Sequence, residues 1–297
     1  MVLAPIAFFA YNRPAHTRQT VEALRANPLA ASTELHVFSD GPKTQDAARL
    51  VREVRAYLRT IDGFSSVKIT ERDRNFGLAG SVIDGVTRLC EAAGRAIVVE
   101  DDLKVAPGFL AYMNAALNRY RDESKVMQIS GHMYPVDVPV RDDAFFLPFI
   151  SSWGWATWDR AWRKFDPLAT VYAQLKSDAL RRHAFNMNGA YDYFSMLEAQ
   201  LEGKVDSWAI LWNLSVFMND GLVLYPGKSL VENKGFDGSG IHCRGEAPDQ
   251  AVETDFTPKR LPPVGMDPAV CERVFDYFRA RRSPRERLRA LAARFFA

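Results

Sequence analysis

Short apolar runs alternate with amphipathic patterns along the first hundred residues. An apolar run that ends in a turn signal is typical of a strand buried on both faces, and apolar residues at steps of three and four predict a helix. The apolar runs are 5–10, 35–38, 67–70 and 96–99, and the helical patterns are 16–25, 47–61 and 78–93. This alternation predicts an α/β domain with a mostly parallel sheet and helices on both faces.

Beyond residue 103 the alternation is less regular. The pattern predicts helices over 107–120, 171–185, 191–201 and 208–218, and strands over 126–129, 145–150 and 222–225. Residues 244–267 are rich in proline and acidic residues, which is typical of an extended linker. We therefore expect one large domain over residues 1–250, followed by a linker and a basic amphipathic helical tail over 251–297.

Composition narrows the class of protein. The net charge of +2, from 38 basic and 36 acidic residues, gives no indication of nucleic-acid binding, and we expect no nucleic-acid partner. Three widely spaced cysteines without a CxxC pair favour a reducing compartment over a disulfide framework or a cysteine zinc site. The apolar start lacks the basic region of a signal peptide, and no apolar stretch is long enough to span a membrane. We expect a cytoplasmic protein.

The C-terminal segment is rich in arginine and contains a single acid, Glu286. Leu288, Leu291 and Phe295 fall on one face of a predicted helix. Two interpretations stay open. In the first, residues 280–297 form a peripheral contact with the inner face of a membrane. In the second, the helix docks on its own domain or on a second subunit.

Glu100, Asp101 and Asp102 follow the apolar run 96–99 directly. Like charges this close raise one another's pKa values, so a divalent cation is their natural partner. Carboxylate oxygens suit Mg²⁺ or Mn²⁺, which bridge protein carboxylates to substrate phosphates. Ligands of open α/β sheets bind at the carboxyl ends of strands, where these acids are predicted to lie. The alternative is a solvated acidic turn that merely ends a strand.

The segment 96–109, AIVVEDDLKVAPGF, resembles the donor-site segment of the N-acetylglucosaminyltransferase I family, inverting glycosyltransferases with the GT-A fold. Shorter stretches follow in the same order: YNRP at 11–14, FSDG at 38–41, Gly154-Trp155 with Trp162, and Lys234-Gly235 with His242. The resemblance covers about residues 4–243. Around 233–243 the chain is still more similar to bacterial sugar transferases.

The resemblance implies a GT-A fold, which is Rossmann-like with a mixed, mostly parallel sheet. It also implies metal-dependent transfer, with inversion, from a nucleoside-diphosphate sugar to a hydroxyl acceptor. We expect a UDP-sugar as donor, a glycan or lipid-linked glycan as acceptor, and a role in polysaccharide biosynthesis at the cell envelope. By the same resemblance Asp102 binds the metal, Glu100 and Asp101 contact the ribose and donor sugar, Arg13 reaches the base or phosphate, and Asp40 binds the base edge. Without the resemblance to this family, Arg13 and Asp40 would be interpreted as ordinary turn residues.

Inverting transfer needs a carboxylate that takes the proton of the acceptor hydroxyl. Asp206 is the candidate base, because it lies near the position of the base in the resembled family. The alternative is that Asp206 caps the helix that begins after it, which is a common role for Asp. Asp192 and Asp237 are the alternative candidates for the base.

His242 ends a glycine-rich loop and could complete the metal shell or contact the diphosphate, although it could also be an ordinary surface histidine. Lys234 is a nearby cation for the phosphates. Flat aromatic faces stack on sugar rings, so Trp153 and Trp155 are candidates for an acceptor or sugar pocket. Tryptophan is also common core material, and we expect Trp155 and Trp162 in the core and Trp153 closer to the site.

Other enzyme signatures are absent: the sequence contains no GxGxxG after its first apolar run, no HExxH and no GxSxG. The nearest alternative enzyme is a sugar nucleotidyltransferase, which shares strand-end acids but opens with a glycine-rich loop. A nucleotide-sugar-binding protein without catalysis, and a membrane scaffold acting through the basic tail, also stay open.

Overall fold

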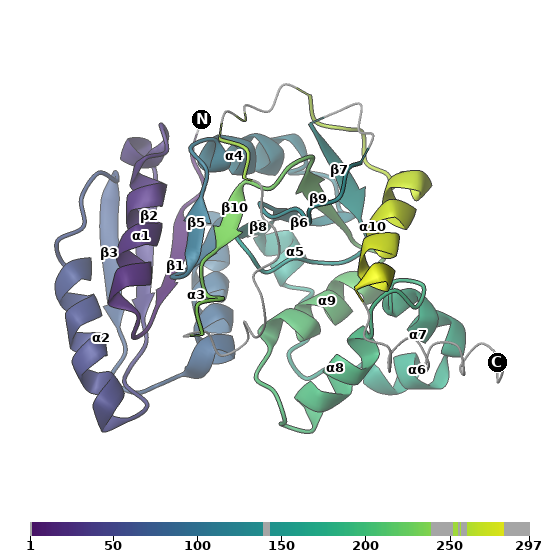
Figure 1. Ribbon diagram of the computed structural model, residues 1–297, viewed down its shortest axis with the longest axis horizontal. Helices are drawn as coiled ribbons and strands as arrows, with labels where there is room; N and C mark the ends of the chain where they lie inside the picture. Colours follow the sequence, from purple (N-terminus) through teal and green to yellow (C-terminus); the bar gives the residue numbers. More distant parts are fainter. Residues whose placement is uncertain (1, 139–142, 239–251, 255, 257–259, 282–297) are drawn as a thin grey trace.

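The computed structural model describes residues 2–138, 143–238, 252–254, 256 and 260–281. Its central element is an eight-stranded sheet (Figure 1). The strands are β1 (Ile6–Ala10), β2 (Glu34–Ser39), β3 (Ser66–Glu71), β4 (Arg95–Glu100), β6 (Val126–Ser130), β7 (Ala144–Leu147), β8 (Trp155–Trp158) and β9 (Leu222–Pro226). Across the sheet their order is β3-β2-β1-β4-β8-β6-β9-β7. β7 and β8 run opposite to their neighbours, and the other strands share one direction.

The chain reverses its path across the sheet at β1. From β1 it moves outward to β2 and β3, and it then returns to β4 on the other side of β1. β1 and β4 are paired in parallel as far as Phe9 and Glu100, so both strands end at the same edge. Open α/β sheets bind ligands at the carboxyl ends of strands at such a switch point. The segments that follow β1 and β4 therefore meet where a ligand site is expected.

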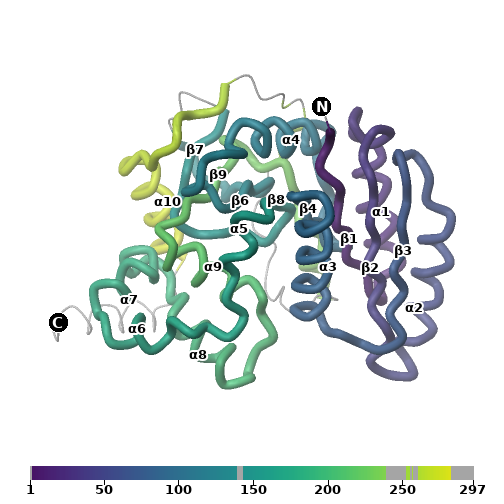
Figure 2. Tube along the Cα trace, turned by 180° about the vertical axis from the view of Figure 1, so that it is seen from behind, coloured from purple at the N-terminus to yellow at the C-terminus, as the bar shows by residue number. Residues whose placement is uncertain are grey.

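Helices cover both faces of the sheet (Figures 1 and 2). Those on one face are α1 (Pro14–Arg25), α2 (Gln45–Leu58) and α4 (Phe109–Arg119), and those on the other are α3 (Gly77–Ala93), α5 (Asp159–Trp162), α9 (Trp208–Met218) and α10 (Pro268–Ala280). Each face has its own buried apolar cluster, and neighbouring residues of β1 alternate between them, with Phe8 in the first cluster and Phe9 in the second. This arrangement confirms the predicted α/β class with a mixed, mostly parallel sheet.

Smaller elements complete the chain. They are the 3₁₀ turn η1 (Ala30–Ser32) and the helices α6 (Tyr172–Ser177), α7 (Ala179–Phe185) and α8 (Tyr193–Leu201). α6, α7 and α8 pack with α9 around a third apolar cluster that includes Leu175, Phe185 and Leu197. A separate two-stranded antiparallel sheet joins β5 (Leu103–Val105) to β10 (Val231–Asn233). This small sheet begins directly after Asp102, and it brings the chain around residue 234 back to the end of β4.

The structure differs from the predicted elements in two places. The helix predicted over 171–185 is divided into α6 and α7, because Asp178 has an extended backbone and its side chain accepts a hydrogen bond from Arg181 N at 2.9 Å, which starts a new helix. The segment 155–158, for which no element was predicted, is a strand. β8 ends at Trp158, and α5 begins with the next residue.

Of the predicted linker and tail over 251–297, the structure describes α10 and parts of the segment before it. α10 packs on the sheet through Val270, Val274 and Phe275, which belong to the second buried cluster. The amphipathic face proposed for residues 288–295 lies outside the described residues. Among the helices that are described, none combines the length and the apolar character needed to cross a membrane.

Candidate functional site

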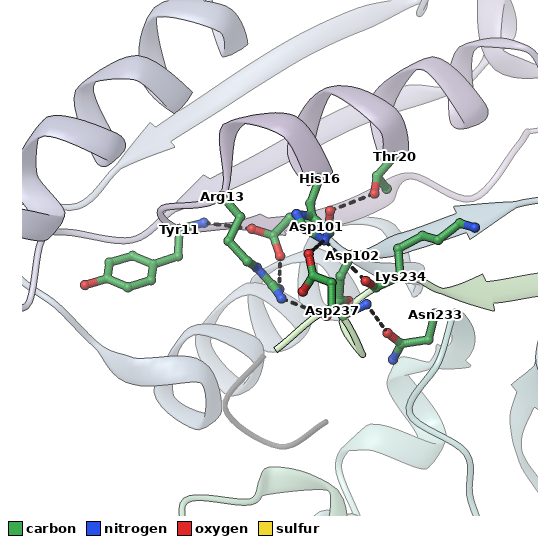
Figure 3. A network of polar contacts seen from close by, with 10 residues as sticks. Tyr11, Arg13, His16, Thr20, Asp101, Asp102, Asn233, Lys234 and Asp237 are labelled. Carbon is green, nitrogen blue, oxygen red and sulfur yellow. Dashed lines mark hydrogen bonds and ion pairs between the residues drawn. The ribbon is translucent and has the colours of Figure 1, made fainter. Parts of the chain in front are cut away.

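Arg13 bridges two of the three clustered acids. It follows β1, and Asp101 and Asp102 follow the neighbouring β4, so the parallel pairing of the two strands brings the three side chains together. The guanidinium donates through Nη2 to Asp101 Oδ1, and through Nη1 to Asp102 Oδ2 at 3.0 Å. Figure 3 shows Arg13 pointing toward both carboxylates, with the Tyr11 side chain turned away from them. The site is therefore a buried acidic pair held by one cation.

Asp101 fixes the positions of the Arg13 side chain and of the backbone that follows β1. Only 3% of the residue is exposed. Its Oδ2 accepts the backbone N–H of Tyr11 at 3.3 Å, and its carbonyl oxygen accepts the hydroxyl of Thr20 at 2.8 Å. Burial raises the pKa of Asp101, and the Arg13 guanidinium acts in the opposite direction. Both carboxylate oxygens are thus used within the protein, and they fix the end of β1 and the Arg13 side chain.

The electrostatics of the cluster depend on Arg13. Burial, followed by the nearby charges of Asp102 and Asp101, raises the pKa of Glu100 to about 8, and the charge of Arg13 acts in the opposite direction. For Arg13, burial lowers the pKa, but the carboxylates of Asp101 and Asp102 outweigh this effect and leave it above its usual value. The guanidinium is therefore permanently charged, and it is the main neutralising partner of the acids.

Asp102 has one oxygen available for a further partner. Its Oδ2 is used by Arg13, while its Oδ1 makes no hydrogen bond in the described part of the chain. No group of three His, Cys, Asp or Glu residues suited to a metal ion occurs among the described residues. Mg²⁺ is commonly held by only one or two carboxylates together with substrate phosphates, and the free oxygen of Asp102 fits that mode. A divalent ion here would take its remaining ligands from water or from a bound ligand.

The small sheet places a second segment against Asp102. The backbone N–H of Lys234 donates to the carbonyl oxygen of Asp102 at 2.8 Å. A Cβ atom on Gly235 would lie 2.4 Å from Asp102 Oδ2, so a larger residue here would force the carboxylate to move. The Lys234 ammonium is paired with Glu232 at 2.5 Å, and Figure 3 shows the Lys234 side chain extending away from the acids. Lys234 therefore meets Asp102 through its backbone, and its side chain is engaged elsewhere.

His16 is a site residue that the sequence analysis did not identify. Its Nε2 lies 3.3 Å from the Lys234 carbonyl oxygen and 3.2 Å from Asp237 Oδ2. His16 lies in the first turn of α1, three residues after Arg13, which precedes the helix, and that spacing is the signal that could have found it. Asp237, held in reserve as a base, is thus the partner of His16. The predicted ligand His242 lies outside the described residues.

Asp40 follows β2 and organises the loop that leads into α3. Its carboxylate accepts the backbone N–H groups of Gly41 at 2.9 Å, Phe76 at 2.8 Å and Gly77 at 3.0 Å, and the Asn75 amide at 3.0 Å. Both oxygens are engaged in the protein, so Asp40 shapes this side of the site through the backbone of residues 75–77. Its predicted contact with a base stays a prediction.

Asp206 is exposed and does not cap α9. The cap is Ser207, whose hydroxyl accepts the N–H of Ile210 at 3.4 Å, so the capping alternative for Asp206 was wrong. A Cβ on Gly77 would lie 3.1 Å from Asp206 Oδ2, which places Asp206 at the start of α3. No contact among the described residues links it to Arg13 or the acids. Asp192, the other reserve, caps α8 by accepting Ser195 N at 3.1 Å.

The two candidate tryptophans have different environments. Trp155 is fully buried and stacks on Trp208 with ring centroids 5.0 Å apart, so it is a core residue and not part of a pocket. Trp162 packs in the same cluster, as expected. Trp153 lines a cavity of about 280 Å³, and its ring also meets the edge of Phe236, which follows Gly235.

No protein-family model and no curated protein matches this sequence. Among solved structures, the chain is similar to GalNAc-T7 with UDP, GalNAc and Mn²⁺, with 11% identity, a TM-score of 0.44, and coverage of 76% of this chain and 43% of that chain. It is similar to S. aureus TarS, with 12% identity, a TM-score of 0.37, and coverage of 76% and 36%. It is also similar to the mannosyltransferase PcManGT from Pyrobaculum calidifontis in complex with GDP-Man and Mn²⁺, with 9% identity, a TM-score of 0.36, and coverage of 73% and 69%. The chain spans less than half the length of the first two proteins, and similarities at this level assign it to no family.

Proposed function

We propose that this chain is a glycosyltransferase of the GT-A type, which transfers a sugar from a nucleoside-diphosphate donor, a UDP-sugar, to a hydroxyl acceptor. The observation that carries the proposal is the contact of Arg13 with Asp101 and Asp102 at the switch point between β1 and β4. The similarity of residues 96–109 to the donor segment of the resembled family supports it. The acceptor would be a glycan or a lipid-linked glycan.

The chemistry of the site suits a diphosphate. Arg13 is a cation at the N-terminus of α1, and a helix N-terminus favours an anionic group. A bound Mn²⁺ or Mg²⁺, held by Asp102, would supply charge neutralisation for the departing nucleoside diphosphate. Asp101 holds the Arg13 guanidinium in place, and Gly235 lets the backbone of the second segment pack closely on Asp102. These residues would bind and orient the donor.

Transfer also needs a base that takes the proton of the acceptor hydroxyl. Asp206 is exposed, makes no hydrogen bond among the described residues, and lies at the start of α3. These properties support Asp206 as the base of an inverting transfer, since such a base must reach a bound hydroxyl and be free to take its proton. Asp206 would act from the side of Gly77 and Asp40.

Product analysis tests this function. The full chain is incubated with a set of nucleotide sugars and Mn²⁺, with and without glycan and lipid-linked acceptors, and the released nucleotide is identified. Release of a nucleoside diphosphate, including slow release through hydrolysis of the donor, is expected. Release of pyrophosphate from a nucleoside triphosphate and a sugar phosphate would instead identify a sugar nucleotidyltransferase, and no turnover with retained donor binding would identify a non-catalytic binding protein.

A further inference from the structure

The cavity beside Trp153 is distinct from the acidic site. It has a volume of about 280 Å³ and lies where α8, α9 and α10 meet the segments that follow β6 and precede β8. Much of its wall is aromatic, with Trp153 and Phe278 among the lining residues. No Asp, Glu, Lys or Arg lines it among the described residues. A charged group would lose its water here without gaining a counter-charge, so the cavity suits an uncharged ligand.

Asn213 presents an unpaired amide group to this cavity. The residue lies on α9 and is only 2% exposed. Its Oδ1 accepts the backbone N–H of Ile150 at 3.0 Å, and this bond fixes the orientation of the amide. Its Nδ2 makes no hydrogen bond in the described part of the chain, and it is not closed to solvent. Buried polar groups are rarely left without a partner, so the two N–H bonds of Nδ2 point to the oxygen atoms of a ligand.

Two tyrosine hydroxyls add to the polar lining. Tyr134 follows β6, and Tyr193 is the first residue of α8. Neither hydroxyl makes a hydrogen bond among the described residues, and neither is closed to solvent. Burial, followed by the charge of Tyr134, raises the pKa of Tyr193, because the two phenol groups lie near each other. Each neutral phenol can both donate and accept a hydrogen bond.

His132 belongs to the wall of the cavity and does not anchor a ligand. Its ring meets the rings of Tyr134 and Trp153, with centroid distances of 4.8 Å and 4.4 Å. Its Nε2 is closed to solvent, so no ligand atom can reach it. The polar groups that are open to a ligand are therefore those of Asn213, Tyr134 and Tyr193, which come from three separate segments of the chain.

These features together select a class of ligand. A hydrocarbon ring would cover the aromatic wall, but it would leave the Asn213 amide and the two phenols without partners, which costs free energy. An anion would lack a counter-charge. A pyranose ring carries hydroxyl groups along its edge, which donate and accept, and C–H groups on its faces, which pack on aromatic side chains. An uncharged sugar ring therefore fits both parts of the lining.

Trp153 connects this cavity to the proposed donor site. It lines the cavity, and its ring also meets Phe236 at a centroid distance of 5.8 Å. Phe236 directly follows Gly235, which packs on Asp102. The segment that adjoins the proposed metal ligand thus also adjoins the wall of the cavity.

α9 relates the candidate base to the same cavity. Ala209 and Ile210, in the first turn of α9, line the cavity, and Asp206 immediately precedes Ser207, the cap of this helix. We propose that the cavity binds one uncharged pyranose ring of the acceptor glycan. The identification of this ring as part of the acceptor rests on the proposed transferase function.

Titration with simple glycosides tests the proposal. The methyl glycosides of glucose, galactose, mannose and N-acetylglucosamine each carry one uncharged pyranose ring, and the methyl glycosides of glucuronate and galacturonate add a negative charge. Saturation-transfer NMR on the full chain, with UDP and Mg²⁺ and again without them, is expected to show saturable binding of at least one neutral glycoside. Its uronate should bind at least about tenfold more weakly. No saturable binding of any neutral glycoside, or equal affinity for the uronates, would overturn the proposal.

Cyclohexanol distinguishes a sugar site from an apolar one. It has a ring of similar size but a single hydroxyl, so it would leave most of the polar lining unpaired. Its binding should be weaker than that of the best glycoside. Tighter binding of cyclohexanol than of all four neutral glycosides would show that the cavity prefers an apolar ring, against the proposal.

Three variants assign the binding to the cavity. Tyr134→Phe and Tyr193→Phe each remove one hydroxyl, so the best glycoside is expected to bind about fivefold more weakly to either variant. Their melting temperatures should not fall, because neither hydroxyl has a partner among the described residues. Ala209→Phe fills the cavity from α9 and should abolish binding. Tyr57→Phe, on α2 at the other face of the sheet, is the matched control. Wild-type affinity in both cavity Tyr→Phe variants would contradict the proposed site.

The same samples separate this proposal from the donor site. Affinity for UDP and UDP-sugars with Mn²⁺ is measured in parallel by calorimetry. Nucleotide binding without any glycoside binding overturns the cavity proposal alone. If a glycoside binds as expected but no nucleotide does, the cavity remains a sugar site, and the transferase function is contradicted instead. Displacement of the glycoside by a UDP-sugar but not by UDP would place the donor's sugar in the cavity and contradict its assignment to the acceptor.

Discussion

Arg13 and Asp102 lie 89 residues apart in the chain and are joined by a hydrogen bond of 3.0 Å from Nη1 to Oδ2. The contact exists because β1 and β4 are neighbours, although β2 and β3 lie between them in the sequence. Among the described residues, it leaves Asp102 with one carboxylate oxygen that makes no hydrogen bond. A metal ion at this site would therefore share Asp102 with a fixed cation, and changes to Asp102 should affect nucleotide binding more than they affect folding.

Asp102→Asn should lower kcat/KM for transfer by about a hundredfold or more, because the amide cannot neutralise a metal that stabilises the leaving diphosphate. The melting temperature should change little, since Asn keeps the size of the side chain. Asp122→Asn, at an exposed turn, is the control and should behave like the wild type. Turnover of Asp102→Asn close to the wild-type rate would show that the carboxylate has no such role.

Gly235→Ala tests the packing of the second segment against Asp102. The new Cβ would lie 2.4 Å from Oδ2, so the carboxylate must move and weaken its bond to Arg13. Overpacking of this kind costs about 1–3 kcal/mol, and we expect Mn²⁺-dependent donor affinity to fall about tenfold. Gly265→Ala is the matched control, because its Cβ would meet no atom within 4 Å. Equal donor affinities in the two variants, measured by calorimetry, would refute the close packing.

Asp206→Asn and Ser207→Ala should separate catalysis from capping. Asp206→Asn is expected to bind the donor normally but to lose transfer, since the amide cannot take the acceptor's proton. Ser207→Ala removes the cap of α9, which costs about 1 kcal/mol of stability, and it should keep its turnover. Melting curves and transfer rates of both variants show which residue acts in catalysis and which one stabilises α9. An active Asp206→Asn variant would eliminate this residue as the base.

The pH dependence of the melting temperature should reveal the raised pKa of Glu100. Burial, followed by the charges of Asp102 and Asp101, raises its pKa in the folded chain to about 8, above the ordinary value of 4.5. A carboxyl group with a raised pKa stabilises the folded state at low pH, and this contribution is lost as the pH rises through about 8. In metal-free buffer, Glu100→Gln should therefore gain melting temperature relative to the wild type at pH 8.5 but not at pH 4.5. A difference that does not vary with pH would contradict this.

The basic tail is tested by deletion. If residues 280–297 contact a membrane, the full chain should float with vesicles that contain anionic lipid, and it should do so less at high salt. A chain that ends at residue 281 should remain in the soluble fraction. Equal flotation of both proteins would rule out the membrane role of the tail.

The elements with a strong local period were predictable from the sequence. α2 carries Ala47, Val51, Val54 and Leu58 on one buried face, and β4 is an unbroken apolar run before an acid. β8 was missed because it has only four residues and Thr157 interrupts them, so it shows neither an unbroken apolar run nor a regular alternation. β5 and β10 have three residues each and are defined by their pairing with each other. A pairing between distant segments leaves no local signal.

The candidate site was predictable only in part, for the same reason. Asp101 and Asp102 could be singled out because they follow an apolar run. The contact of Arg13 with them depends on the order of strands in the sheet, which the sequence alone did not determine. The engagement of Asp40 with residues 75–77 and the contact of His16 with Asp237 likewise join separate segments.

The central claim is that Asp102 and Arg13 together bind a nucleoside diphosphate with the help of a divalent ion. Isothermal titration of UDP and of UDP-sugars into the purified chain, with Mn²⁺ and again with a chelator, tests it most directly. The account predicts saturable binding with Mn²⁺ that falls at least about tenfold with the chelator and is lost in Asp102→Asn. Absence of nucleotide affinity in the presence of Mn²⁺, or affinity that is unchanged by both the chelator and the substitution, would contradict it.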